Sequence, residues 1–320
     1  MFNKIKIIVS AVVIGAFCNT VMAYPGKTVK IIIPSVPGGV SDAVGRLFAE
    51  EMAKELKVSV IPENVPGVGT YMAIKRTLTS EADGYTVPIF ANTIVTMPYV
   101  DKNAGFQSSD FQAVSFLSKM PLALTVGHDS PFNSLQELVD YAKKNPMMVS
   151  YSSVGIGTTS HLPAELFAQS AGIEMQMISY KGSAQAIPDV VSGRVHFMMS
   201  NAATAGELIK AKKVKVLATT TKERNEHFPG IPTFTELGYP EVVYELILGL
   251  MVKKGTSAEV IAKLSEAAEK AKNYENVQRR LKELGQDIPA ENTPEKFQNF
   301  LANEEKVMSQ VVKKANISVN

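Results

Sequence analysis

The chain has 320 residues, enough for one large or two medium-sized domains, each with its own hydrophobic core. Hydrophobic residues make up 45% and charged residues 20%, which are ordinary values for a globular protein. The 33 basic and 31 acidic residues leave a net charge of +2 and form no concentrated basic block. This composition argues against a nucleic-acid-binding protein, so we expect no nucleic-acid partner.

The first 23 residues have the pattern of a secretory signal. Lys4 and Lys6 precede an almost wholly apolar run at 7–17, and the residues that end at Ala23 suit a signal peptidase. The run is shorter than the roughly 20 residues that a membrane-spanning helix needs. We therefore expect export by the Sec route, cleavage after Ala23 and a mature protein in the periplasm.

The only cysteine, Cys18, lies inside this signal. A lipoprotein signal needs a small residue before its cysteine, and Phe17 stands there, so we do not expect lipidation. The mature chain then has no cysteine, which excludes disulfides, a thiol nucleophile and a thiolate metal site. The four histidines show no metal-ligand spacing, so we expect no metal and no other cofactor.

In the first part of the mature chain, short β-branched runs alternate with helical periodicity. Residues 29–33 predict a buried strand, and the apolar residues of 44–56 recur as on one face of a helix. Two further strands are predicted at 58–61 and 86–90, with a helix at about 68–80 between them. This order is typical of parallel sheets with crossover helices.

The same alternation continues to the end of the chain. Strands are predicted at 122–126, 149–152, near Met177, Phe197 and Val216, and at 246–252, and helices at 135–144, 160–171, about 184–191 and 203–211. From Ser257 onward the pattern is that of amphipathic helices with Glu and Lys on the outer face. The length fits two α/β lobes of about 100–180 residues each.

The segment 34–42 connects a strand to a helix and has the features of an anion site. Gly38 and Gly39 permit a close backbone approach, and Ser41 or Asp42 can cap the helix. The N–H groups at a helix start, with the positive end of the dipole, attract anions. A plain tight turn is the alternative. Asp42 either pairs with Arg46 on the helix surface or accepts a donor from a ligand.

The segment 151–161 is a second strand-to-helix connection, rich in glycine and hydroxyl groups. Residues 155–160 only approximate a dinucleotide-binding fingerprint, because Ser160 replaces its last glycine. His161 either donates to a ligand carboxylate or packs at the helix start. Ser152 and His161 have no evident orienting acid, and the chain has no G-x-S-x-G elbow and no P-loop. We therefore predict a protein that is not an enzyme, with an exported α/β hydrolase as an alternative.

Other polar residues follow the remaining strands, at the edge where open α/β sheets bind ligands. Taken singly, each of these residues is also explained by ordinary turn chemistry. The candidate ligand-binding residues are Pro37, Gly38, Gly39, Ser41, Asp42, Asn92, Thr93, Ser152, Ser153, Gly155, Gly157, Thr158, His161, Lys181 and Asn201.

Five motifs occur in order along almost the whole mature chain. They are Pro37-Gly38-Gly39 with Asp42, Glu63-Asn64-x-Pro66-Gly67, Asp83-Gly84-Tyr85-Thr86, Ser152-Ser153-x-Gly155-x-Gly157-Thr158 with His161, and Tyr180-Lys181-Gly182-Ser183. With these motifs, the chain resembles the periplasmic solute-binding receptors of tripartite tricarboxylate transporters, the Bug family. Each motif alone is weakly specific, but their combination and order are strongly so.

The resemblance implies a two-lobed Venus-flytrap fold of α/β class, each lobe a mainly parallel sheet flanked by helices. Residues 24–124 and 245–320 would form one lobe, and 125–244 the other. It also implies a small carboxylate held in the interlobe cleft by backbone amides, hydroxyls and water. The implied partners are the membrane subunits of such a transporter, or alternatively a sensor kinase. A monomer suits either role.

The chain also departs from the family pattern. Ser35, Val36 and Val40 stand where relatives often have an aromatic residue, a proline and a glycine. The run Met199-Ser200-Asn201 replaces a common Phe-Asp-Asn, and 245–248 lacks frequent aromatics. These changes concern the part of the ligand beyond its carboxylate, so citrate, a smaller dicarboxylate, an amino acid or an aromatic acid all fit the sequence.

Overall fold

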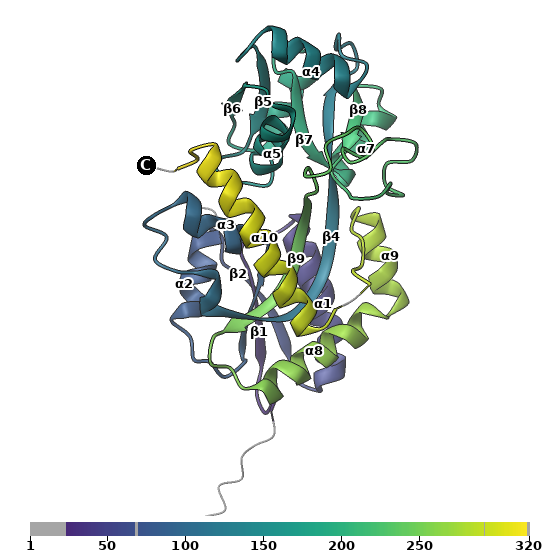
Figure 1. Cartoon of the computed structure of the whole chain (residues 1–320). Helices are drawn as coiled ribbons and strands as arrows, with labels where there is room; N and C mark the ends of the chain where they lie inside the picture. Colours follow the sequence, from purple (N-terminus) through teal and green to yellow (C-terminus); the bar gives the residue numbers. More distant parts are fainter. Residues whose placement is uncertain (1–23, 68–69, 291, 319–320) are drawn as a thin grey trace, which may run out of the picture.

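The computed structural model describes residues 24–67, 70–290 and 292–318. The predicted export signal at 1–23 lies outside these residues, as does the start of the helix predicted at 68–80. Figure 1 shows two lobes, each a sheet with helices on its faces, joined through the middle of the molecule. Among the described helices, none is long and apolar enough to cross a membrane. The two-lobed α/β fold that the resemblance implies is confirmed.

We call one part of the molecule the first lobe. It is built on the sheet β2-β1-β3-β9, in which β9 spans Glu245–Lys253, and on the first half of β4 (Phe111–Gly127). Its N-terminal elements are β1 (Val29–Ile33), α1 (Val40–Leu56), β2 (Val60–Asn64), α2 (Tyr71–Leu78), β3 (Thr86–Phe90) and α3 (Thr93–Val100). Strand β1 pairs in parallel with β2 and β3. Val44, Phe48 and Met52 recur at four-residue spacing on α1 and are fully buried, because this face packs against the sheet.

The long strand β4 (Phe111–Gly127) passes through both lobes (Figure 1). Its first half pairs antiparallel with β9 (Glu245–Lys253), and its second half with β7 (Phe197–Asn201) and β8 (Val214–Thr219). Only 122–126 was predicted as a strand. The first half escaped prediction because Ser115 and Ser118 interrupt its apolar pattern, yet both are buried. Their hydroxyls bond to the side chains of Asn292 at 3.1 Å and Gln286 at 2.8 Å.

The second half of β4 begins the second lobe. Its other elements are α4 (Leu135–Lys144), β5 (Val149–Ser153), α5 (Leu162–Ala171), β6 (Met175–Ser179), α6 (Ser183–Val191), β7 (Phe197–Asn201), α7 (Ala202–Lys210) and β8 (Val214–Thr219). Strand β5 pairs in parallel with β6 and β7. Tyr151, Phe167 and Phe197 are fully buried in the core of this lobe.

Three helices end the chain. Helices α8 (Ala258–Lys272) and α9 (Glu275–Glu283) pack on the first lobe, whereas α10 (Pro294–Lys314) runs diagonally across both lobes (Figure 1). Phe297 of α10 is buried in the first lobe and Met308 in the second. Helix α10 is therefore a third connection between the lobes, which the sequence pattern did not predict. The boundaries predicted after residues 124 and 244 stay a prediction.

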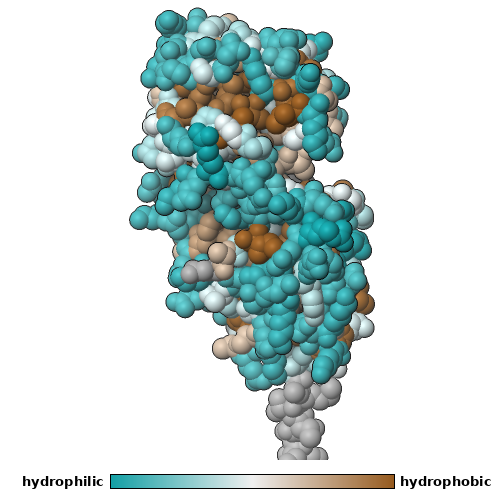
Figure 2. Space-filling model, turned by 90° about the vertical axis from the view of Figure 1, so that its right-hand side faces the viewer, coloured by the Kyte–Doolittle hydropathy of each residue, from teal (hydrophilic) through white to brown (hydrophobic). Residues whose placement is uncertain are grey.

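Figure 2 shows one face of the molecule, on which hydrophilic residues cover most of the surface and hydrophobic residues gather mainly in the second lobe.

Most predicted elements are confirmed to within two or three residues. Strand β2 starts at Val60 rather than residue 58, because Lys57 ends α1 in a left-handed conformation and the turn needs two further residues. Helix α3 was not predicted at all, since Pro98 stands inside it.

Candidate functional site

The loops that carry the candidate residues lie at the ends of parallel strands. In the first lobe, β1 and β3 are parallel neighbours, so the turn at 34–39 and the start of α3 share one edge of the sheet. In the second lobe, β5, β6 and β7 are parallel, so the loops that follow them also share one edge. Each lobe therefore has one edge that gathers the candidate residues.

The register of β4 shows that both edges face the junction of the lobes. Pro121 pairs with Glu245 at the start of β9, and the next residue, Leu122, pairs with Asn201 at the end of β7. Because β9 runs antiparallel to β3, the end of β3 points toward Glu245. The start of β9 and the end of β7 thus lie within one residue of each other along β4, and the end of β3 points toward the same junction of the lobes.

At the first turn, the buried side chain of Asp42 stabilises the conformation of the backbone. Its carboxylate accepts hydrogen bonds from the Gly38 N–H at 2.9 Å, Arg46 Nε at 3.0 Å and Asn64 Nδ2 at 2.8 Å. Burial raises its pKa, but these three bonds outweigh burial and lower the pKa to about 2. Asn64 also donates to the Ser35 carbonyl oxygen at 3.0 Å. The charge of Asp42 therefore holds the turn, with both carboxylate oxygens engaged within the protein.

The start of α1 remains open to an anion. Its N-cap is Gly39, and no side chain caps the helix, because Asp42 is turned toward Gly38. The Ser35 hydroxyl lies beside Gly39 and is buried with no hydrogen-bond partner among the described residues. A helix of 17 residues thus presents its first-turn amides and the positive end of its dipole without a built-in acceptor. An anion at this position satisfies both.

In the second loop, His161 is a buried hydrogen-bond acceptor. The Gly157 N–H donates to His161 Nδ1 at 3.0 Å, and burial lowers the pKa of His161 to about 4. The ring is therefore neutral at neutral pH, with its proton on Nε2, which lies 3.9 Å from Glu165 Oε1. Because Nδ1 is occupied, His161 orients the loop and is not poised as a base for Ser152.

Most of the remaining groups of this loop bond to one another. The Ser153 hydroxyl donates to the Gly155 carbonyl at 2.8 Å and accepts from the Gly155 N–H at 3.1 Å. The Thr158 hydroxyl donates to the same carbonyl at 2.7 Å, and Ser160 Oγ accepts from the Val154 N–H at 3.0 Å. The loop is pre-shaped by its own hydroxyls, so fewer of its amides are free than the sequence suggested, and the start of α1 is the more open anion site.

A cavity of about 550 Å³ lies between the lobes, beside this loop. Its described lining consists of Tyr71, Thr93, Met97, Val100, Asp101, Asn103, Val154, Gly155, Ile156, Gly157 and Thr158. A Cβ on Gly157 would lie 2.9 Å from the side chain of Val100, so the lobes touch at this point. The Thr93 hydroxyl is buried without a partner among the described residues. Four candidate residues, Thr93, Gly155, Gly157 and Thr158, therefore line the cavity.

The other candidates lie outside this lining. Pro37 lies in the turn after the neighbouring strand β1, and Ser41 lies in the first turn of α1. Ser152 and Ser153, at the end of β5, are buried. Lys181 is exposed. Asn201 caps α7, since its Oδ1 accepts from the Thr204 N–H at 2.9 Å. The structure thus gathers part of the candidate set around the cavity, and gives some of the rest local structural roles.

Asn92 is one of these structural residues. It is completely buried, and its Nδ2 donates to Glu304 Oε1 at 2.8 Å and to the Glu245 carbonyl at 3.0 Å. Its Oδ1 accepts from the Ile247 N–H at 2.9 Å. Glu245 also forms an ion pair with Lys119, at 3.1 Å. Asn92 therefore ties the end of β3 to β9 and α10 at the lobe junction, with its amide group fully engaged.

This junction makes stability depend on pH through Glu304. Burial, and then the charge of Glu245, raise the pKa of Glu304 to about 7, although the bond from Asn92 opposes the rise. The folded state holds this proton more tightly than the unfolded state. Stability should therefore fall by about 2.5 kcal/mol between about pH 4.5 and pH 7. Glu304→Gln keeps an acceptor for Asn92 and should remove this loss, measured by urea unfolding across that range.

A suitable control is Glu305→Gln, which alters the next residue. Glu305 bonds to the hydroxyls of Tyr99 and Ser108 rather than to Asn92. This variant should keep the wild-type dependence of stability on pH over the same range. If the free energy of unfolding changes equally with pH in Glu304→Gln and in the wild type, the pKa of Glu304 is not raised by folding and the prediction is wrong.

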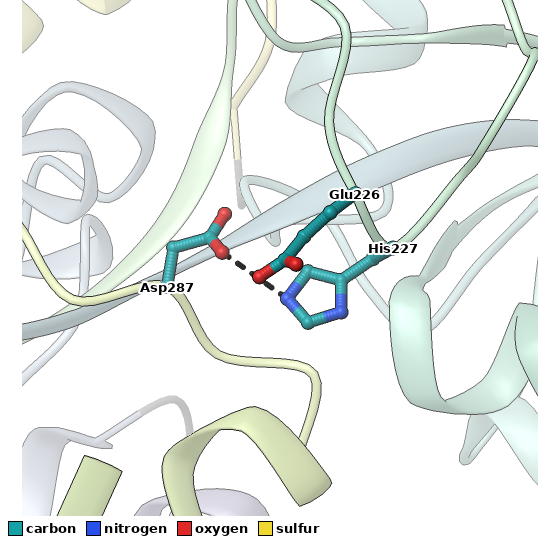
Figure 3. A group of neighbouring side chains, drawn as sticks. All are labelled: Glu226, His227 and Asp287. Carbon is teal, nitrogen blue, oxygen red and sulfur yellow. Dashed lines mark hydrogen bonds and ion pairs between the residues drawn. The ribbon is translucent and has the colours of Figure 1, made fainter. Parts of the chain in front are cut away.

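A second group of side chains bridges the lobes on another side. Figure 3 shows Glu226 and His227, from the loop after β8, beside Asp287, which follows α9. His227 Nε2 lies 3.1 Å from Asp287 Oδ1, and Asn225 Nδ2 donates to Asp287 Oδ2 at 2.6 Å. Glu226 pairs with Lys282 at 2.9 Å. Potential metal-ligand atoms of the three labelled residues lie within 4.8 Å of one another. Sequence spacing cannot reveal this group, and its present bonds already account for it as an interlobe contact.

Apart from Thr93, sequence reasoning missed the cavity wall formed by α3. Thr93, Met97 and Val100 are spaced as on one face of a helix, and all three line the cavity. That spacing was the available signal, but Pro98 and the short length of the segment concealed the helix. Asp101 and Asn103, just beyond α3, complete this wall.

Comparison with known proteins identifies similar receptors and binding proteins. A family model described as "Tripartite tricarboxylate transporter family receptor" matches residues 44–317. Protein BugT of Bordetella pertussis (strain Tohama I) is 30% identical over 287 residues, covering 88% of this chain and 87% of BugT. The structure of periplasmic binding protein BugD superposes with a TM-score of 0.77 at 28% identity, covering 92% of this chain and all of that one.

A further solved structure, R. palustris Rpa4515 with adipate, has a TM-score of 0.79 at 27% identity and covers 92% of this chain and all of its own. The family match spans most of the sequence and includes α1 from residue 44 onward, the second loop and α10. The chain therefore belongs to the family of tripartite tricarboxylate transporter receptors.

Proposed function

We propose that this protein is a periplasmic solute-binding protein that captures a small organic carboxylate between its lobes and delivers it to the membrane subunits of a tripartite tricarboxylate transporter. The observation on which the proposal rests is the start of α1, which no side chain caps because the Asp42 carboxylate bonds to Gly38 in the preceding turn. It lies at the same sheet edge as the start of α3, one wall of the interlobe cavity. The adipate bound by a relative of the same fold supports a carboxylate as the ligand.

Backbone and hydroxyl donors suffice to bind such an anion. A hydrogen bond to a charged group contributes about 1.5–3 kcal/mol, and burial strengthens it. Three or four such bonds, less the cost of association, reach the roughly −8 kcal/mol of micromolar binding. The first-turn amides of α1 and the unpartnered hydroxyls of Ser35 and Thr93 are donors of this kind.

Binding at the junction also provides a signal for a transporter. A ligand that touches both lobes shifts the population toward the closed arrangement. We place the lobe boundaries near residues 124 and 245, where the chain crosses between lobes, with a monomer as the working unit. Nothing in the site resembles a nucleophile with its base and orienting acid, because His161 Nδ1 is already bonded to Gly157, so we propose binding without catalysis.

Export is tested separately from binding. Expression of the full chain in a bacterium, followed by N-terminal sequencing of the periplasmic fraction, should yield Tyr24 as the first residue, because the signal is cleaved after Ala23. An uncleaved chain, or a chain retained in the cytoplasm, would contradict this part of the proposal.

The proposed function predicts ligand-dependent stabilisation. Mass spectrometry of the purified protein under native conditions should identify a co-purifying organic acid. After removal by partial unfolding and dialysis, adding the same acid at 100 times its Kd should stabilise the protein by about 2.7 kcal/mol. The measurement is the melting temperature over a series of carboxylate concentrations, with the neutral amide of each acid as a control.

Carboxylates and their amides should differ, because only the anion benefits from the helix dipole. If no carboxylate raises the melting temperature, the proposed function is wrong. Turnover of a stabilising compound would instead indicate an enzyme. Delivery is tested by co-purification of the liganded protein with the transporter's membrane subunits in detergent, which should fail when the ligand is omitted.

A further inference from the structure

The cavity next to the proposed carboxylate site has a mainly apolar wall. Met97 and Val100 of α3 face it from the first lobe, and Val154 and Ile156 from the second loop. Val154 is 37% exposed and Ile156 is 40% exposed, although both are large hydrophobic residues at a lobe interface. Exposed apolar side chains that converge on one cavity are typical of a site that binds an apolar part of a ligand.

The charge on this wall is negative. Among the described lining residues there is no lysine, arginine or histidine, and the only carboxylate is Asp101. Asp101 is the C-cap of α3, and its Oδ1 accepts from the Asn103 N–H at 2.8 Å. The C-terminal end of a helix carries a partial negative charge, which adds to that of Asp101. This end of the cavity therefore repels a carboxylate.

Helix α3 connects the proposed anion site with this repelling end. It starts at Thr93, at the sheet edge shared with the turn before α1, and ends eight residues later beside Asp101. At 1.5 Å per residue, the two ends are about 12 Å apart. A ligand whose carboxylate lies at the α1 end would extend along Met97 and Val100 and point its far end toward Asp101.

We propose that the ligand is a carboxylate with an apolar chain or ring and no second negative charge at its far end. This inference rests on the proposed function and narrows its substrate class. The proposed ligand differs from adipate, the compound described with the R. palustris relative, because adipate has a carboxylate at both ends. The selecting features are the apolar wall and Asp101.

Hexanoate and adipate test the proposal, because they have the same number of carbons and differ only in the second carboxylate. Isothermal titration of the ligand-free full-length mature protein should give an affinity for hexanoate at least about tenfold higher than for adipate. Asp101→Asn should bring the two affinities to within about threefold by strengthening the binding of adipate. Asp129→Asn, an exposed change elsewhere in the second lobe, should leave the difference as in the wild type.

Each alternative result has a defined meaning. Equal or tighter binding of adipate by the wild type would overturn the inference and leave the proposed function intact. Binding of citrate or malate without binding of hexanoate would do the same. An unchanged preference in Asp101→Asn would refute the role of Asp101. If no carboxylate binds, the proposed function fails together with the inference.

Discussion

Gly39→Val is expected to weaken carboxylate binding by at least about 100-fold while the protein stays folded, because two or more charge-assisted hydrogen bonds would be lost. Gly39 has φ −81°, which valine adopts, and a new Cβ would lie 3.9 Å or more from its neighbours. The fold therefore tolerates the side chain. Its branches would cover the uncapped amides of α1, where we place the ligand. Titration calorimetry and the melting temperature measure the two effects separately.

The matched control is Gly206→Val in α7. Gly206 also has free space around its Cα, but it lies in a surface helix of the second lobe, outside the proposed site. The Gly206→Val variant should bind carboxylates with the same affinity as the wild type. Gly157→Val is a poorer test, because φ is +74° there and the new Cβ would lie 2.9 Å from Val100, so misfolding and lost binding are mixed. Unaltered affinity in Gly39→Val would refute the site at α1.

Asp42→Ala is expected to reduce the free energy of unfolding by about 3 kcal/mol, because three hydrogen bonds to a buried carboxylate are lost together. The low pKa of Asp42, about 2, also predicts the direction in which stability changes with pH. The folded state holds this carboxylate ionised to lower pH than the unfolded state does. Wild-type stability should therefore fall by about 2 kcal/mol as the pH drops from about 4 to about 2.

The alanine variant has no carboxylate to protonate, so its stability should lack this component between pH 4 and pH 2. Asp140→Ala, which removes an exposed carboxylate that accepts one bond from Gln136, should cost less than about 1 kcal/mol and keep the wild-type pH dependence. Urea unfolding at several pH values gives both quantities. A loss below 1 kcal/mol in Asp42→Ala would mean that the turn does not depend on its carboxylate.

Local patterns predicted most elements of the fold. Runs such as 29–33 and 86–90 have the composition of buried strands, and the periodicity of α1 needs only its own residues. The turns at 34–42 and 151–161 were recognisable because glycine and hydroxyl residues stand between a strand and a helix. These strand, helix and turn patterns are formed by residues that are close in the sequence, so they can be recognised from a single sequence.

The elements that escaped prediction have either distant partners or a misleading local residue. The first half of β4 looked too polar for a buried strand, because the bonds from Ser115 and Ser118 go to residues more than 160 positions away. The cavity wall on α3 was concealed by Pro98. The end of the proposed ligand site beside Asp101 was therefore not recognised from the sequence.

The sequence by itself determined the α/β class and the two glycine-rich turns and predicts the export signal, because each is encoded in consecutive residues. Only the tertiary structure decided which polar groups of those turns are free. It engages Asp42, Asn92 and His161 within the protein and leaves the start of α1 uncapped. The physical reason is that a hydrogen-bonding group is available to a ligand only if folding brings no partner to it. For Asn92, that partner is Glu304, 212 residues away.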